Sequence, residues 1–275
     1  MTEIAAKSNL EHTVNEFNKL SIQVSLNGLS FCVLDTVDKS ILTSEHIVFK
    51  KEHNPYQLLE AFKLLFEKHH LHQKEFSEII VAHRNNLFSL VPKPLFDENE
   101  MANYLKFNTK ILANDHIAYD TIENYDIINV FVPFVNINNY IYDIFGEFNY
   151  THSGTVMIHS LLGSKTDTKN PTCYIHIMEN EFEITVISQK KLLLYNSFKY
   201  TTKEDFIYYI LFTLEQLQLD TETIKLMLFG AVKENDSLFN ICYEYIKDIS
   251  LFTPPDTLYP MTNEKDGIDF KALNS

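Results

Sequence analysis

Histidine is the residue type of this chain best able to do chemistry near neutral pH, and three histidines cluster. His69, His70 and His72 have side chains of the kind that bind zinc. The cluster follows the last turn of a predicted helix, where cationic and polar side chains interact favourably with the helix dipole. We therefore interpret it as a solvated helix end and expect no metal site.

Two further histidines each stand beside groups that could contact an anion. His83 and Arg84 follow a predicted buried strand, where α/β sheets present ligand groups. His152 precedes Ser153 and Gly154 at the start of a predicted helix, a position that suits an anion and, more commonly, a helix cap. We favour the cap. The spacing of the remaining residues identifies no Ser-His-Asp or Cys-His arrangement.

The composition argues against several classes of protein. A chain of 275 residues that is 45% hydrophobic forms one large or two small domains. Its formal charge of −14 opposes phosphate backbones and anionic lipids, so we expect no nucleic-acid partner. The sequence shows no signal peptide and no apolar run long enough to span a bilayer, which predicts a cytoplasmic protein without membrane insertion. Three widely spaced cysteines, Cys32, Cys173 and Cys242, predict buried free thiols.

Alternating and helical periodicities predict the elements that would position these residues. Residues 20–26 and 29–34 alternate apolar with polar side chains around Asn27 and Gly28, which predicts a tight hairpin with that pair as its turn. A third strand over residues 41–50 follows. Asn54 and Pro55 then begin a helix. Its apolar face is formed by Leu58, Leu59, Phe62, Leu65 and Phe66.

The chain contains this order of elements twice. A constant offset of 153 residues superimposes the meander in residues 171–200 on residues 19–35. A second offset, of 148, superimposes the helices and carries the apolar run at residues 79–82 onto residues 227–230. Such runs are typical of buried parallel strands, so each half is predicted to be β-β-β-α-β.

The first copy is followed by additional elements, and a linker-like stretch at residues 163–170 separates the two halves. The additions are a strand at 87–92, a helix at 97–107, a hairpin of 116–120 with 127–134, a helix at 136–148, a strand near Tyr150 and a segment at 156–162. A helix at 237–246 and a strand at 249–252 complete the second half.

The duplicated order resembles the actin-like ATPase and sugar-kinase superfamily, in which two ribonuclease-H-like domains face each other across a nucleotide cleft. The motifs LSIQVSLNGLSFCVLD, NYTHSGTVMIHSLL and CYIHIMENEFEITVIS more narrowly resemble a Bacteroidetes domain-of-unknown-function family with an actin-like fold and no assigned activity. The resemblance implies an α/β fold of two ribonuclease-H-like halves, each β-β-β-α-β plus additions, in an actin-like ATPase arrangement. The implied units are an N-terminal extension (1–19), a first domain (20–163), a second domain (164–252) and an extended C-terminal tail (253–275).

Catalytic members of that superfamily carry Asp-x-Gly after the first strand of each half, to organise magnesium and admit phosphate oxygens. Neither half has the aspartate here. Only Gly230, matched by Ala82, could represent the adenosine-site glycines, and six glycines in all leave no phosphate-cradling loop. The carboxylates of Glu179 and Glu181 would repel phosphate unless a cation intervened. We expect no cofactor and no magnesium-dependent ATP hydrolysis. The residues that would face the cleft are Gln23, Asn27, Gly28, His176, Glu179 and Asn180.

Two functions of different classes remain open. We prefer a non-catalytic actin-like module that acts through protein binding, with a partner protein or a second copy of itself, comparable to pilus- and secretion-associated members of the superfamily. The alternative is a divergent nucleotide- or small-molecule-binding enzyme that uses the interdomain cleft. That alternative requires Asn27 and Asn180 to face each other across the two halves.

Overall fold

The computed structural model describes residues 17–107, 109–164 and 170–252. The expected C-terminal tail, most of the N-terminal extension and most of the linker-like stretch lie outside these residues, so the domain boundary stays a prediction.

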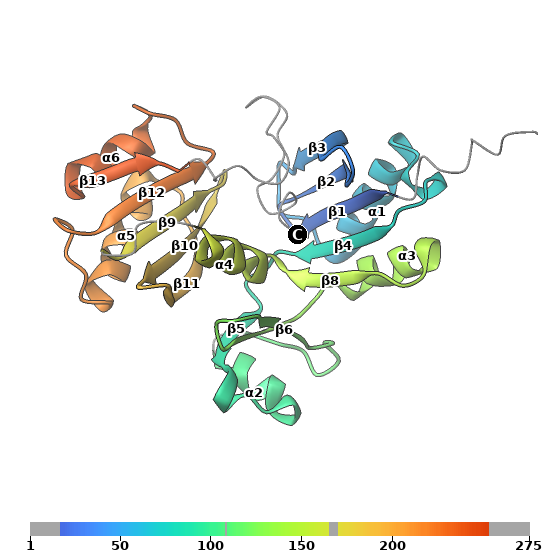
Figure 1. Cartoon of the computed structure of the whole chain (residues 1–275), viewed down its shortest axis with the longest axis horizontal. Helices are drawn as coiled ribbons and strands as arrows, with labels where there is room; N and C mark the ends of the chain where they lie inside the picture. Colours follow the sequence, from blue (N-terminus) through green and yellow to red (C-terminus); the bar gives the residue numbers. More distant parts are fainter. Residues whose placement is uncertain (1–16, 108, 165–169, 253–275) are drawn as a thin grey trace, which may run out of the picture.

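The first half is built on a five-stranded sheet with the order β3-β2-β1-β4-β8 (Figure 1). Its strands are β1 (Asn18–Ser25), β2 (Gly28–Asp35), β3 (Ser40–Val48), β4 (Glu78–His83) and β8 (Asn149–His152). The first three form an antiparallel meander, whereas β4 pairs in parallel with both β1 and β8. Helices α1 (Pro55–Lys68) and α3 (Val135–Phe145) pack on one face and share a hydrophobic core with it. A short 3-10 helix (Leu71–Gln73) follows α1.

Helix α1 begins where the sequence predicts. The Asn54 side chain accepts a hydrogen bond from the Gln57 N–H, the Gln57 side chain accepts one from the Asn54 N–H, and Pro55 occupies the first turn. On the face turned to the sheet, Leu58 and Phe62 are fully buried.

The second half repeats this topology with the order β11-β10-β9-β12-β13. Its strands are β9 (Thr172–Ile177), β10 (Glu181–Ser188), β11 (Lys191–Lys199), β12 (Lys225–Gly230) and β13 (Asp248–Leu251). Helices α5 (Lys203–Gln216) and α6 (Ser237–Tyr245) pack on this sheet around a second core. The predicted duplication of β-β-β-α-β is therefore confirmed.

The predicted register of the repeat is wrong by one residue in the buried strand. The helices keep the offset of 148, but Val81 lies beside Ile22 and Leu228 lies beside Ile175, which is an offset of 147. Because side chains alternate along a strand, a slip of one residue would send the core set to the opposite face. Both Val81 and Leu228 are fully buried, as the corrected register requires.

A small third sheet, ordered β5-β7-β6, is inserted into the first half and lies below it in Figure 1. It consists of β5 (Phe88–Pro92), β6 (Ala118–Ile122) and β7 (Ile127–Phe131), packed against α2 (Met101–Leu105). The helix predicted over 97–107 is shorter: a 3-10 turn (Glu98–Glu100) precedes α2, and another (Lys93–Leu95) follows β5.

Helix α4 (Ser153–Gly163) lies between the two main sheets (Figure 1). It contacts β4, β6 and β8 on one side and β11 on the other, and its Met157 and Ile158 are fully buried. The helix therefore joins the inner faces of the two halves into one packed unit. No helix among the described residues is long and apolar enough to cross a bilayer.

Candidate functional site at the junction of the two hairpin turns

The first hairpin turn consists of Leu26 and Asn27, not of Asn27 and Gly28 as predicted. Gly28 is already the first residue of β2 and pairs with Ser25. A Cβ at Gly28 would lie 2.5 Å from the Ile47 carbonyl oxygen, so glycine is required there by the close approach of β3. Gly28 thus has a packing role. The Asn27 carbonyl accepts from the Phe49 N–H at 2.9 Å, which ties the turn to the end of β3.

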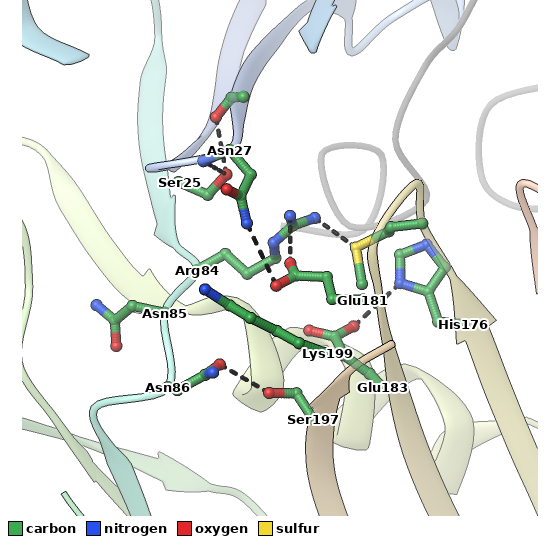
Figure 2. Close-up of polar contacts among 12 residues, drawn as sticks. Ser25, Asn27, Arg84, Asn85, Asn86, His176, Glu181, Glu183, Ser197 and Lys199 are labelled. Atoms are coloured by element: carbon green, nitrogen blue, oxygen red, sulfur yellow. Dashed lines mark hydrogen bonds and ion pairs between the residues drawn. The ribbon is translucent and has the colours of Figure 1, made fainter. Parts of the chain in front are cut away.

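The second hairpin turn meets the first through Glu181, at the start of β10. Its Oε2 accepts a hydrogen bond from Asn27 Nδ2 at 3.4 Å, and its Oε1 lies 2.6 Å from Arg84 Nη2 (Figure 2). The two charged side chains are only 12% and 13% exposed. Arg84 also contacts the sulfur of Met178. The Glu181 carboxylate therefore connects the first hairpin turn of the second half to the first hairpin turn of the first half.

The loop that carries Arg84 is fixed on several sides. The Arg84 N–H donates to the Val24 carbonyl at 2.8 Å, and Asn85 Nδ2 donates to the Val132 carbonyl at 2.8 Å. His152 accepts from the Gly154 N–H through Nδ1, so its Nε2–H donates to the Asn85 carbonyl at 3.1 Å. His152 is also the N-cap of α4, as the preferred interpretation expects.

His83, the last residue of β4, is fully buried beneath this loop. Its Nδ1 accepts from the Phe134 N–H at 3.2 Å, so Nε2 carries the proton and donates to Asn138 Oδ1 at 2.9 Å. Burial disfavours the charged imidazolium and lowers the pKa of His83 to about 3. The imidazole therefore stays neutral and acts as a structural bridge to α3.

On the second half, His176 belongs to a buried hydrogen-bonded group. The Glu183 carboxylate lies 3.0 Å from His176 Nδ1 and accepts from the Tyr195 hydroxyl at 3.0 Å. His176 also stacks on Phe229, with ring centroids 4.9 Å apart. Burial, followed by the Glu183 carboxylate, raises the pKa of Tyr195 well above its usual value. These contacts give His176 the surroundings of a structural histidine.

The other sequence candidates are placed differently. Gln23 is buried on the face of β1 opposite to the core side chains of Ile22 and Val24. Glu179 and Asn180 are exposed at the tip of the second turn, where the Asn180 carbonyl accepts from the Tyr200 N–H. The two turns are joined by the hydrogen bond from Asn27 to Glu181.

Arg84 is the junction residue that the sequence identifies only in part. Its position directly after a buried strand indicates a ligand group, but nothing in the sequence identifies Glu181 as its partner. Gly230, by contrast, has His83 and not Ala82 as its counterpart in the corrected register. Its φ of +90° and the nearby Ile177 carbonyl oxygen exclude a side chain there, so Gly230 has a packing role.

Two exposed contacts extend the junction along β11. Lys199 Nζ lies 2.7 Å from Glu52 Oε2. Ser197 Oγ donates to Asn86 Oδ1 at 2.7 Å (Figure 2). Both join residues of the second half to residues of the first.

The remaining chemistry-capable side chains have structural surroundings. All three cysteines are buried and free, as predicted. His69 contacts the Glu45 carboxylate at the end of α1 and packs edge-on against Phe31. Among the residues that the structure describes, no three His, Cys, Asp or Glu side chains are grouped so as to hold a metal ion.

Comparison with known proteins agrees with this architecture. A solved protein of Bacteroides thetaiotaomicron, with an actin-like ATPase fold and unknown function, superimposes with a TM-score of 0.75 at 19% identity, covering 88% of this chain and 93% of that one. The PilM–PilN type IV pilus biogenesis complex gives a TM-score of 0.52 at 10% identity, covering 87% of this chain and 89% of that one. No curated protein sequence matches significantly.

At these identities the structural likeness establishes the fold alone. The profile of a family described as "Protein of unknown function (DUF3822)" matches residues 7–249, which is most of the chain. The chain therefore has an actin-like ATPase fold and belongs to the DUF3822 family.

Proposed function

We propose that this chain is a non-catalytic actin-like module that acts through protein binding. The observation that carries the proposal is the ion pair of Arg84 with Glu181, which lies between the two hairpin turns. In an actin-like ATPase these turns grip nucleotide phosphates. Here the place is taken by a carboxylate that already has a cationic partner and an amide donor.

A phosphate would meet an unfavourable electrostatic environment at this junction. To reach the Arg84 guanidinium it would have to displace Glu181, and it would then lie near the two carboxylates of Glu179 and Glu181. Displacing Glu181 exchanges its contact with Arg84 for a contact of the phosphate, costs the hydrogen bond from Asn27, and leaves the displaced carboxylate near the phosphate. The binding free energy of a nucleotide would have to offset that cost.

Protein binding is supported by the fold and by the surface. The PilM–PilN structure is a complex, so this fold occurs in a protein assembly. In addition, Tyr208 and Phe212 stack on the outer side of α5 and are 59% and 44% exposed. Aromatic side chains are enriched in protein interfaces. The partner is another protein or a second copy, and a cytoplasmic location stays a prediction from the sequence.

A thermal-shift experiment with ATP, ADP and magnesium tests the proposal against the divergent cleft enzyme. At 1 mM nucleotide, a site with a Kd of 10 μM would stabilise the protein by about 2.7 kcal/mol. We expect no shift, together with recovery of a partner by pull-down. A shift that Asn27→Ala and Glu179→Ala both abolish would overturn the proposal, because those residues would then form a nucleotide site.

A further inference from the structure

Helices α1 and α5 are counterparts in the two repeats, and their buried faces correspond. The offset of 148 places Leu58 on Phe206 and Phe62 on Ile210, and all four side chains are fully buried. Both helices also begin with a capping box. Helix α1 is therefore an internal reference for α5, because a difference between their exposed faces does not come from packing on the sheet.

The exposed face of α1 carries charged side chains that form ion pairs. Glu60 lies 2.9 Å from Lys63, and Lys68 lies 2.7 Å from Glu45 of β3. Charged residues of both signs on an outer helix face are typical of a surface that stays in contact with water.

The second half has uncharged side chains at all four of these positions. In the order Glu60, Lys63, Lys68 and Glu45, the counterparts are Tyr208, Leu211, Gln216 and Asn196. Asn196 is the counterpart of Glu45 because it lies opposite Ile184, as Glu45 lies opposite Phe31. The outer face of α5 therefore has aromatic and neutral side chains where that of α1 has two ion pairs.

An exposed aromatic pair lies at the centre of this face. The rings of Tyr208 and Phe212 stack with their centroids 6.0 Å apart. Tyr209 continues the aromatic surface toward β11, since its ring contacts that of Tyr208 and stacks on Phe198 at 4.8 Å. A contiguous exposed aromatic surface of this kind is typical of a binding site for another protein.

Acidic residues lie at both ends of the aromatic surface. One helix face contains the positions i, i+4, i+7, i+8 and i+11, which are Glu204, Tyr208, Leu211, Phe212 and Glu215. We call this set the α5 stripe. At 1.5 Å per residue it is about 16 Å long. Both glutamates are exposed, so the stripe presents apolar surface between two negative charges.

The charges of the stripe decide which occupant fits. A second copy of α5 would place Glu204 beside Glu215 of the copy in an antiparallel arrangement, and each glutamate beside its own equivalent in a parallel one. Like charges therefore meet in either orientation. A helix with lysine or arginine at both ends of an apolar stripe would instead be complementary, and the net charge of −14 also favours a basic partner.

Helix α5 is accessible on the outside of the second half. Ile175 of β9 packs in the same core as α5, whereas the neighbouring Tyr174 packs in the core that contains Met157 of α4. Because adjacent side chains of a strand point to opposite faces, α5 and α4 lie on opposite sides of this sheet. A partner helix on α5 would not have to displace α4.

We infer that the α5 stripe binds an amphipathic helix of a partner protein. The apolar side chains of that helix cover Tyr208 and Phe212, and its basic residues contact Glu204 and Glu215. This inference rests on the proposed protein-binding function and names its surface and the class of partner.

A panel of fluorescein-labelled helical peptides tests the inference by fluorescence anisotropy. Each peptide has Leu, Phe or Met at the three central positions of a stripe with the same spacing, Lys or Arg at its two ends, and Ala and Gln elsewhere. Each has a counterpart with Glu at both ends. We expect at least one basic peptide to bind about ten times more tightly than its Glu counterpart. A proline at its centre should abolish binding, because it breaks the helix.

Variants of the aromatic pair locate the binding site. The double variant Y208A/F212A should weaken the basic peptide about tenfold or more, as expected for the loss of two central aromatic contacts. The matched control is Y56A/L64A on α1, which also removes two exposed apolar side chains. It should leave the affinity unchanged.

Variants of the two glutamates test the role of charge. E204Q/E215Q should weaken the basic peptide about three- to tenfold and should leave its Glu counterpart no weaker, because exposed charge contacts contribute modestly. The matched control, E60Q/E67Q, removes two exposed carboxylates from α1 and should have no effect.

Three results would overturn the inference. They are no peptide binding at millimolar concentration, an affinity that Y208A/F212A lowers no more than Y56A/L64A does, and a concentration-dependent dimer that Y208A/F212A dissociates, which would make a second copy the occupant. None of these involves nucleotide binding. The proposed function fails through nucleotide binding at the junction, so the two failures can be told apart.

Discussion

Replacing the charged residues at the junction should reveal a strong energetic coupling between Arg84 and Glu181. At an effective dielectric constant of about 20, two unit charges 2.6 Å apart attract each other by about 6 kcal/mol. Desolvation of two side chains that are 12% and 13% exposed offsets much of this attraction. We expect a net coupling of about 2–3 kcal/mol.

The assay is a double-mutant cycle measured by urea denaturation and followed by circular dichroism. It uses Arg84→Met, Glu181→Gln and the double variant. Each single substitution leaves the other charge at the junction without its opposite charge. The losses of unfolding free energy in the two single variants should therefore add up to more than the loss in the double variant.

A second cycle on Lys199 and Glu52 is the matched control, because this ion pair also joins the two halves. Its side chains are 58% and 51% exposed, so solvent screens the interaction and the coupling should stay below about 1 kcal/mol. A coupling for Arg84 and Glu181 that does not exceed the control value would refute the argument that their ion pair holds the junction.

Three further substitutions or treatments have defined outcomes. Gly28→Ala should destabilise the fold by about 1–3 kcal/mol, whereas Gly163→Ala, where a Cβ meets nothing within 4 Å, should change stability by less than about 1 kcal/mol; urea denaturation measures both. His83 has a pKa of about 3 in the folded state against an ordinary value of 6.5, so the unfolded chain takes up the proton first. The contribution of neutral His83 to the free energy of unfolding should be constant above pH 7 and should fall by about 1.4 kcal/mol per pH unit between pH 6.5 and 3. His83→Gln should remove this pH dependence. Burial raises the pKa of Cys32 and of Cys242 to about 12, so a thiol reagent at pH 8 should react only after denaturant is added; rapid reaction of the native protein would contradict their burial.

The sequence predicts the elements well where a local pattern defines them. The capping pair of Asn54 and Pro55 marks the start of α1, and the alternation around Asn27 marks the first hairpin. The errors lie where distant backbone decides the outcome. The pair Asn27-Gly28 predicts that Gly28 lies in the turn. The structure requires a glycine there for a different reason, because the backbone of Ile47, nineteen positions later, approaches it closely.

The junction itself could be predicted only in part. The position of Arg84 after a buried strand is visible in the sequence, and the two carboxylates near Asn180 are visible as well. The pairing of Arg84 with Glu181 is not, because it depends on how the second half packs against the first through α4. The error of one residue in the predicted register at Val81 has a similar origin. Two apolar runs of four residues can be aligned equally well one residue apart, whereas the parallel pairing of β4 with β1 allows only one register.

Calorimetric titration of the purified chain with magnesium-ATP tests the central claim most directly, because the claim is that Glu181 and Arg84 occupy the place where phosphate would bind. The account predicts no heat beyond dilution at millimolar nucleotide. A Kd in the micromolar range that Asn27→Ala abolishes would contradict it.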